Sequence, residues 1–339
     1  MKTDRALTFD VLKLNCEKES ARIAAGIRDC VYTKLRKRGV VVALSGGVDS
    51  SVVAALCVQA LGASNVFGIL LPEKESSSQT LALSRLTVRH LAIAALERDI
   101  TDILSAAGCY QYRDEAIRMV IPEYCADYKC KIVLPPLLGR DALRVFSVVV
   151  ESPQGKQIKA RLSAKAYLQI VAATNFKQRV RMMLTYYHAD RLNYAVAGTT
   201  NRQEHDQGFF VKLGDGAGDI KPIAHLYKTQ VFQMAQFLAV PEEIRRRRPT
   251  TDTYSMSQDS EEFYFSVAHD VLDLCLYAKN HDIAPVEVAQ AAHLKIEQVQ
   301  RVYQDIDSKR RTTRYQHEPP LLLENVGDVC DYHNNELLY

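Results

Sequence analysis

The sequence predicts an α/β fold in which a doubly wound, mostly parallel sheet is flanked by helices. Short apolar runs of strand length alternate along the chain with longer segments whose apolar residues recur at helical spacing. A continuous apolar run such as residues 40–44 is typical of a strand buried on both faces, as strands of parallel sheets are. Strands that alternate with helices bring their C-terminal ends, and any ligand, to one edge of the sheet.

The first predicted element is a helix, because Ile23, Ile27, Val31 and Leu35 follow one another every four residues and Gly39 then ends the pattern. Predicted strands cover residues 40–44, 66–71, 97–100 and 194–198. Predicted helices cover residues 52–61, 80–95, 175–191 and 227–239. These segments supply the sheet and the helices that cover it.

The alternation is lost between about residues 105 and 165, where several prolines interrupt the chain. Within this stretch, residues 145–150 and 157–162 predict a β-hairpin. The stretch is too apolar to be disordered, so we expect an insertion in a single domain that covers residues 1–330. Residues 261–307 are predicted to be helical. The chain beyond Pro319 is expected to be irregular, with residues 331–339 as a tail.

The composition excludes some classes of protein. With 339 residues, 47% hydrophobic and 24% charged, the chain can bury a sizeable core. A net charge of +3 does not indicate a nucleic-acid binder. Positive residues gather at 34–38, 245–248 and 309–314; such runs usually form solvated surfaces, and capture of an anionic substrate is the main alternative.

The cysteines and the apolar stretches indicate the compartment. Eight cysteines include no CxxC pair and no histidine at zinc-finger spacing. The first ten residues lack the apolar core of a secretory signal, and no apolar run approaches the ~20 residues that span a bilayer. We expect a cytoplasmic protein with reduced thiols and no membrane partner.

The turn after the first strand carries the strongest chemical signal. It reads Ser45-Gly46-Gly47-Val48-Asp49-Ser50-Ser51 and leads into a helix. The glycines let the backbone approach an anion, and the helix N-terminus favours phosphate. A carboxylate at Asp49 beside phosphates needs a divalent cation between them. An ordinary Gly-rich turn explains a lone SGG but not the whole string, which resembles the signature of the ATP-pyrophosphatase (PP-loop) superfamily. That resemblance implies an adenine nucleotide alpha hydrolase-like fold and cleavage of ATP to AMP and pyrophosphate.

Later motifs narrow the resemblance to one family. The series runs from Asn175-Phe-Lys-Gln-Arg179-Val-Arg181-Met through Gly198-Thr199-Thr-Asn-Arg-Gln-Glu204 to Arg248-Pro-Thr250-Thr-Asp252. Their order and spacing are similar to those of NAD synthase. The resemblance covers residues 40–100 and 170–250 well, the C-terminal helices loosely, and the insertion not at all.

The resemblance implies roles for individual residues. Asp49, Lys228 and Thr250 would be catalytic. The expected ATP-binding residues are Ser45, Gly46, Gly47, Asp49, Ser50, Ser51, Arg179, Arg181, Thr199, Lys228 and Thr250. Asp49 and Glu204 would hold Mg²⁺. The expected substrate-binding residues are Tyr186, Lys212, Asp215, Asp219 and Lys309.

The implied reaction is ATP-dependent amidation of deamido-NAD to NAD through an adenylated carboxylate, with ammonia as nitrogen donor. A separate glutaminase is the alternative ammonia source, and a homodimer is the implied assembly. Three departures leave open an amide-forming ligase for a different carboxylate. Ser308 replaces a family histidine before Lys309-Arg310, the loop after residue 72 is more charged, and the insertion is longer.

Two other classes are disfavoured. A PP-loop enzyme that thiolates tRNA needs catalytic cysteines or an RNA-binding domain, and neither is evident. Residues 283–302 have the spacing of a helix-turn-helix, but the second helix, predicted over residues 296–303, carries Glu297 and Gln298 and few basic groups. No nucleic-acid partner is therefore expected.

Overall fold

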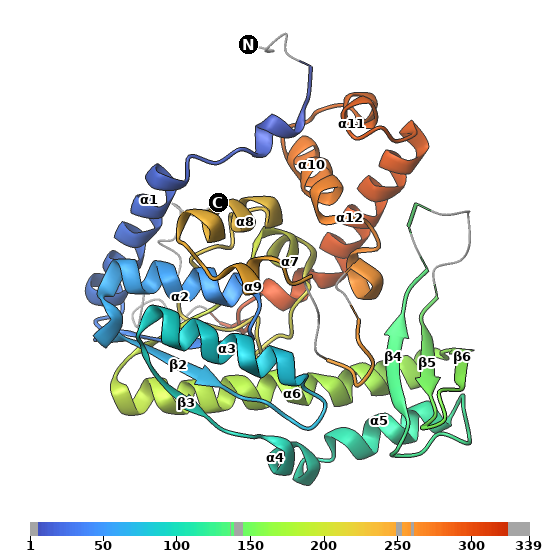
Figure 1. Cartoon of the computed structure of the whole chain (residues 1–339). Coiled ribbons are helices and arrows are strands. Elements are labelled where there is room, and N and C mark those ends of the chain that lie inside the picture. Colours follow the sequence, from blue (N-terminus) through green and yellow to red (C-terminus); the bar gives the residue numbers. More distant parts are fainter. Residues whose placement is uncertain (1–5, 136, 139–144, 249–252, 259–260, 325–339) are drawn as a thin grey trace.

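Four strands form a parallel sheet, in the order β3–β2–β1–β7, in the computed structural model of the chain (Figure 1). The structure describes residues 6–135, 137–138, 145–248, 253–258 and 261–324. The strands are β1 (Val40–Ala43), β2 (Val66–Leu70), β3 (Ala94–Glu97) and β7 (Ala195–Ala197). All three neighbouring pairs are parallel. The predicted parallel α/β fold is confirmed.

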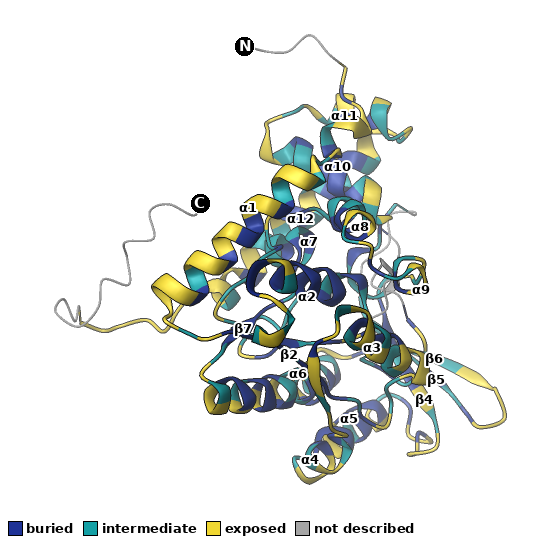
Figure 2. Ribbon diagram, turned by 60° about the vertical axis from the view of Figure 1, so that its left-hand side comes forward, coloured by how far each residue is buried: buried dark blue, intermediate teal, exposed yellow. Residues whose placement is uncertain are grey.

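Alternate residues of β1 enter two different hydrophobic clusters, one on each face of the sheet. Val40 and Val42 pack into a cluster with α1 (Cys16–Arg28), α2 (Val48–Leu61) and α8 (Lys228–Phe237). Val41 packs on the opposite face with α6 (Ala164–Leu192). Figure 2 shows α2 as a largely buried helix, which explains its continuous apolar sequence. The sheet is therefore doubly wound.

The first helix and its stop signal are confirmed with one refinement. α1 ends at Arg28, and the chain continues as a π-helix, η2 (Asp29–Lys34), in which Val31 is fully buried. A short 3-10 helix, η1 (Phe9–Leu12), precedes α1, and another, η3 (Ala63–Asn65), links α2 to β2.

The boundary between the third helix and β3 was predicted wrongly. α3 (Ser78–Leu91) ends because Ala92 adopts a left-handed conformation with φ 50°. The chain then forms β3 at Ala94–Glu97, so the predicted helix over 80–95 is too long and the predicted strand over 97–100 starts too late. Ile100 instead precedes α4 (Thr101–Ala106). The alanines of β3 continue a helical pattern, which hides the break.

α6 begins eleven residues before the predicted start at residue 175. Ser163 caps its N-terminus by accepting the backbone N–H of Ala166. Ala166 and Ile170 pack into the core of the insertion. The first part of α6 therefore belongs to the insertion's core, and its apolar residues do not face the parallel sheet.

α4 leads into the insertion, which contains α5 (Cys109–Arg118) and a three-stranded antiparallel sheet. The predicted hairpin is present as β5 (Ser147–Glu151) and β6 (Gln157–Arg161). The third strand, β4 (Lys129–Val133), was not predicted and pairs with β5. α5 packs along α6 beneath the parallel sheet (Figure 1).

The C-terminal part is helical, as predicted, and has its own core. It contains η4 (Glu261–Phe265), α10 (His269–Asn280), α11 (Pro285–Ala291) and α12 (Ile296–His317). α12 extends far beyond residues 296–303. The length predicted for the second helix of a helix-turn-helix is therefore wrong. In the sequence, two shorter helices, α7 (Arg202–Gln207) and α9 (Glu242–Arg245), lie between β7 and this region. The tail over residues 331–339 lies outside the described residues.

In the described part of the chain, none of the helices combines the length and apolarity that crossing a membrane would require.

Candidate functional site

The loop between β1 and α2 is built from its glycines and serines. Gly46 has φ +67°, and a Cβ at this position would lie 2.4 Å from the carbonyl oxygen of Thr80. Only glycine fits such a position without strain. The hydroxyls of Ser50 and Ser51 both donate to the carbonyl of Gly47, at 3.0 Å each. The loop is thereby held in shape before any ligand arrives.

A cavity of about 760 Å³ opens at the C-terminal edge of the parallel sheet, beside this loop. Its size is that of a site for a small-molecule ligand. Ten of the residues expected in the site line it: Ser45, Gly47, Asp49, Ser50, Arg181, Thr199, Glu204, Asp215, Lys228 and Lys309. The edge predicted from the order of strands and helices is therefore where the cavity lies.

Lys228 and Asp49 form an ion pair at the entrance of the loop. Lys228 is the first residue of α8 and its side chain is almost fully buried. Burial alone would lower the pKa of Lys228, but the carboxylates of Asp49 and Glu204 outweigh it and raise that pKa. The ammonium group is therefore held charged beside the loop.

Glu204 stands behind this pair on α7. Asn201, the residue that caps α7, donates its side-chain amide to Asp49 at 3.0 Å and its backbone N–H to Glu204 at 3.0 Å. Burial, and then the charge of Asp49, raise the pKa of Glu204. Two carboxylates beside an anion-binding loop suit Mg²⁺, which takes one or two protein carboxylates and completes its shell with phosphates and water. Among the described residues, no three or more His, Cys, Asp or Glu side chains are grouped so that they could hold a metal ion by themselves.

Some of the expected site residues do not line the cavity. Gly46 and Ser51 are not part of its wall, and the hydroxyl of Ser51 contacts that of Thr87 at 3.0 Å. Arg179 is exposed and donates to the carbonyl of Lys212, whereas Arg181 lines the cavity. Of these two arginines, both expected to bind ATP, only Arg181 therefore lines the cavity.

Three of the five expected substrate residues also lie away from the cavity. Lys212 donates to the carbonyls of Tyr315 and Glu318, at 2.8 Å each, near the end of α12. Tyr186 donates to Asp219, the third of these residues, at 3.2 Å.

Thr250, which was expected to bind ATP, lies outside the described residues.

The other two expected substrate residues, Lys309 and Asp215, line the cavity. Lys309 on α12 pairs with Asp305 at 2.7 Å and donates to the carbonyl of Tyr264 at 2.9 Å. Burial raises the pKa of Asp215, whose carboxylate accepts the backbone N–H of Val211 at 2.7 Å.

Two further parts of the cavity wall were not among the predicted site residues. Arg247 and Arg248 line it, and Arg247 donates to the hydroxyl of Thr80 at 2.6 Å. The signal for Arg247 was the basic run at 245–248, and Arg248 also begins the motif at 248–252. The other part is aromatic and includes Phe146, Tyr167, Phe209, Phe210, Tyr254, Phe263, Tyr264, Phe265 and Tyr315. These residues come from distant segments, so no local pattern marks them.

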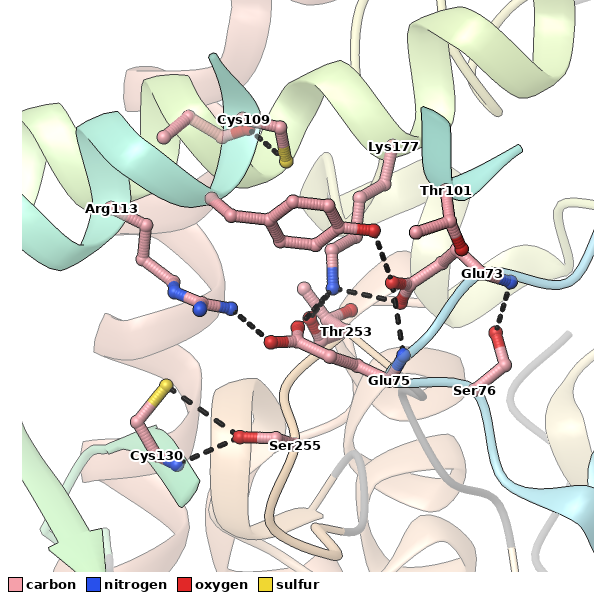
Figure 3. Close-up of polar contacts among 12 residues, drawn as sticks. Glu73, Glu75, Ser76, Thr101, Cys109, Arg113, Cys130, Lys177, Thr253 and Ser255 are labelled. Carbon is pink, nitrogen blue, oxygen red and sulfur yellow. Dashed lines mark hydrogen bonds and ion pairs between the residues drawn. The ribbon is translucent and has the colours of Figure 1, made fainter. Parts of the chain in front are cut away.

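A buried ion cluster lies next to the cavity and was also missed (Figure 3). The ammonium group of Lys177 on α6 contacts Glu73 at 2.9 Å, Glu75 at 2.6 Å and the carbonyl of Thr253 at 2.8 Å. Arg113 on α5 pairs with Glu75 at 2.5 Å. Lys177 and Thr253 line the cavity, so the cluster joins the insertion to the cavity wall.

Comparisons with known proteins agree with the motifs, and they correct the expectation that the resemblance does not cover the insertion, most of which the family model matches. The family model for NAD synthase matches residues 19–133 and 147–320. The chain is 53% identical to the NH(3)-dependent NAD(+) synthetase of Mesorhizobium japonicum, over 94% of this chain and 100% of the relative. It is 35% identical to the protein of that name from Thermotoga maritima, over 81% of this chain and 90% of the relative.

Solved structures share the fold. An NH3-dependent NAD synthetase from Campylobacter jejuni superposes with a TM-score of 0.61 at 21% identity, over 92% of this chain and all of that one. An NMN synthetase from Francisella tularensis gives 0.62 at 20% identity, over 91% of this chain and 99% of that one.

Proposed function

The chain belongs to the NAD synthase family, and from that membership we propose that it makes NAD⁺ by amidating deamido-NAD⁺ with ammonia at the expense of ATP. The observation that carries the proposal is the convergence of Asp49, Glu204 and Lys228 at the Gly-rich loop, in a chain that matches ammonia-dependent relatives over nearly its whole length. The reaction class is formation of a carbon–nitrogen bond by a ligase.

The first step is adenylation of the acid. A carboxylate oxygen of the substrate attacks the α-phosphorus of ATP, the bond to the β-phosphate oxygen breaks, and pyrophosphate leaves. Negative charge builds on the phosphates, and Lys228 supplies a fixed positive charge beside them. An incoming phosphate competes with Asp49 for that ammonium group. The loop amides and the start of α2 supply further donors.

Asp49 and Glu204 would hold Mg²⁺ in this reaction. When bound, Mg²⁺ neutralises phosphate charge and orients the leaving pyrophosphate. Glu204 must be ionised to act as a ligand. Burial raises its pKa and opposes ionisation, and a cation bound nearby would lower that pKa again. Asn201 orients both carboxylates, because it contacts each of them.

The second step is transfer of the acyl group to nitrogen. Ammonia attacks the carbonyl carbon of the adenylate, the bond to the phosphate oxygen breaks, and AMP leaves as the nitrogen loses a proton. Water must be kept out, because it would hydrolyse the adenylate. The aromatic wall of the cavity supports such exclusion. For the acid substrate, we propose contacts from Asp215 and Lys309, which line the cavity. We propose further contacts from Tyr186, Lys212 and Asp219, which do not line the cavity within one chain.

The test is an assay of pyrophosphate release and NAD⁺ formation by the purified chain with ATP, Mg²⁺, ammonium chloride and deamido-NAD⁺. We expect both products, and loss of both in Asp49→Asn and Glu204→Gln with unchanged circular dichroism. A wild-type chain that releases pyrophosphate with another acid, such as a mononucleotide acid, but not with deamido-NAD⁺, would refute the substrate. Full activity in either variant would refute the proposed metal ligands.

The nitrogen source is tested in the same assay. We expect ammonium salts to support NAD⁺ formation and glutamine alone not to, with a separate glutaminase as the other supply. Efficient use of glutamine by the purified chain would contradict this.

We also propose a homodimer. Support comes from α6, on which Leu168, Met183 and Tyr187 are each more than half exposed. Large apolar side chains exposed along one helix favour a protein contact. Light scattering at micromolar concentration should give twice the chain mass, and a monomer would count against the proposal.

A further inference from the structure

One segment of this chain has no counterpart in the family model, which matches residues up to 133 and again from 147. The two described ends of that segment both face the cavity. Leu134 follows β4 and Phe146 precedes β5, and each lines the cavity wall. Both ends of the stretch that the family model does not match therefore contribute to the cavity wall.

The start of this segment is fastened to the C-terminal helices. Leu137 is buried in the C-terminal hydrophobic core, and its backbone N–H donates to the carbonyl of Ser266 at 3.5 Å. Gln298 on α12 donates to the carbonyl of Leu138 at 3.3 Å. The segment thus passes from the antiparallel sheet to the C-terminal core, and Leu134 is held at the cavity between these two attachments.

Phe146 is stacked on Tyr167, which projects from the first turns of α6. Their ring centroids are 4.4 Å apart and the rings are inclined by 18°. Both rings line the cavity and are only partly buried. Near-parallel rings at this distance form a flat surface on which another aromatic ring can stack.

The stacked pair and the Gly-rich loop belong to different parts of the molecule. Phe146 and Tyr167 pack on the hydrophobic core of the insertion, together with Tyr254 and Phe263. The loop begins at the end of β1, whose residues pack in the clusters of the parallel sheet. One cavity therefore joins a phosphate-binding region to an aromatic region.

We propose that Phe146 and Tyr167 form a stacking subsite for a flat heteroaromatic ring of the carboxylate substrate, and that this pair thereby helps to select that substrate. The proposal rests on the proposed function, in which the acid is a dinucleotide with two such rings. ATP occupies the loop side of the cavity, which leaves the aromatic side for the acid.

The binding test uses the absence of tryptophan from the chain. Phe146→Trp places a single tryptophan in the subsite. The matched control is Tyr128→Trp, because Tyr128 packs edge-on against Tyr124 in the same core, at 5.8 Å, and does not line this cavity. Titration with deamido-NAD⁺ should give a saturable change in emission with Phe146→Trp and none with Tyr128→Trp. No change with Phe146→Trp, or an equal change with both, would overturn the proposal.

The kinetic test uses Phe146→Leu, with Tyr128→Leu as its control. We expect Phe146→Leu to raise KM for deamido-NAD⁺ by about tenfold, as loss of one aromatic stacking contact does, with KM for ATP changed by less than about twofold. Phe146→Tyr should restore the wild-type value. Equal changes in both KM values would mean a structural role and overturn the proposal.

The two tests separate this inference from the proposed function. If the wild type forms NAD⁺ but Phe146→Trp does not respond and Phe146→Leu keeps its KM, the subsite is wrong and the function stands. If Phe146→Trp responds to deamido-NAD⁺ while the wild type forms no product from it, the function is wrong and the subsite stands.

Discussion

The carboxylate of Asp273 on α10 caps α8 by accepting the backbone N–H of Thr229 at 2.8 Å. The same fully buried carboxylate accepts the side-chain amide of Gln203 on α7 at 2.8 Å and the backbone N–H of Lys228 at 3.3 Å. A group in the C-terminal core thus fixes the starts of the two helices that carry Glu204 and Lys228.

Asp273→Ala should therefore lower both stability and activity. Loss of a helix cap costs about 1 kcal/mol, and the unpaired buried amides add about 1–3 kcal/mol. We expect a lower free energy of unfolding in urea and a reduced kcat/KM. Asp270→Ala, an exposed change on the same helix, should cost less than about 0.5 kcal/mol. Equal unfolding midpoints for the two variants would contradict the capping role.

Lys177→Met should be among the most destabilising single changes. It leaves Glu73 and Glu75 buried without their shared partner, and breaking a buried ion pair in this way costs about 3–5 kcal/mol. Replacing both glutamates by glutamine in the Lys177→Met background should recover much of the loss. Lys74→Met changes an exposed lysine of the same loop and should have little effect on the urea midpoint. A Lys177→Met midpoint within error of the wild type would refute this assignment.

Gly46→Ala should abolish most activity. An alanine there has an unfavourable φ and places its Cβ against the Thr80 carbonyl, so the loop must move. We expect kcat/KM for ATP to fall by about 100-fold, equivalent to ~2.7 kcal/mol. Gly155→Ala also has a positive φ, +80°, but its Cβ would meet nothing within 4 Å. Gly155→Ala should therefore keep the wild-type activity. An equal loss of activity in both variants would mean that the positive φ, and not the contact with Thr80, causes the loss.

Metal-free protein should become less stable as the pH rises through the pKa of Glu204. Burial raises that pKa above its unfolded value, so the folded state favours the protonated acid. This contribution is complete below the unfolded pKa and is lost as the pH rises through the folded pKa. Glu204→Gln should remove that pH dependence of the melting temperature and be the more stable protein at pH 9, although inactive. A wild-type melting curve that does not change between pH 5 and 9 would contradict the shift.

The sequence predicted those parts of the site that depend on local patterns. The Gly-rich loop, the four parallel strands and the positions of Asp49, Glu204 and Lys228 follow from short motifs between elements of clear periodicity. β4 was missed because it is only five residues long and two of them are lysines, so that its pairing with β5 is what defines it. The ion cluster around Lys177 was missed because its members lie up to 104 residues apart in sequence. The end of α3 was missed because Ala92 takes a conformation that its residue type does not favour.

One helix sets the distance between the two ends of the cavity. Tyr167 and Arg181 are fourteen residues apart on α6, which corresponds to about 21 Å along a rigid axis. Tyr167 belongs to the aromatic side, and Arg181 reaches the sheet edge, where it donates to the carbonyl of Leu71 at 3.2 Å. If the acid binds as proposed, one long enough to extend from one end to the other should gain contacts at both, whereas a mononucleotide acid should reach only one. We therefore expect the length of α6 to make the affinity for the acid depend on the length of the acid.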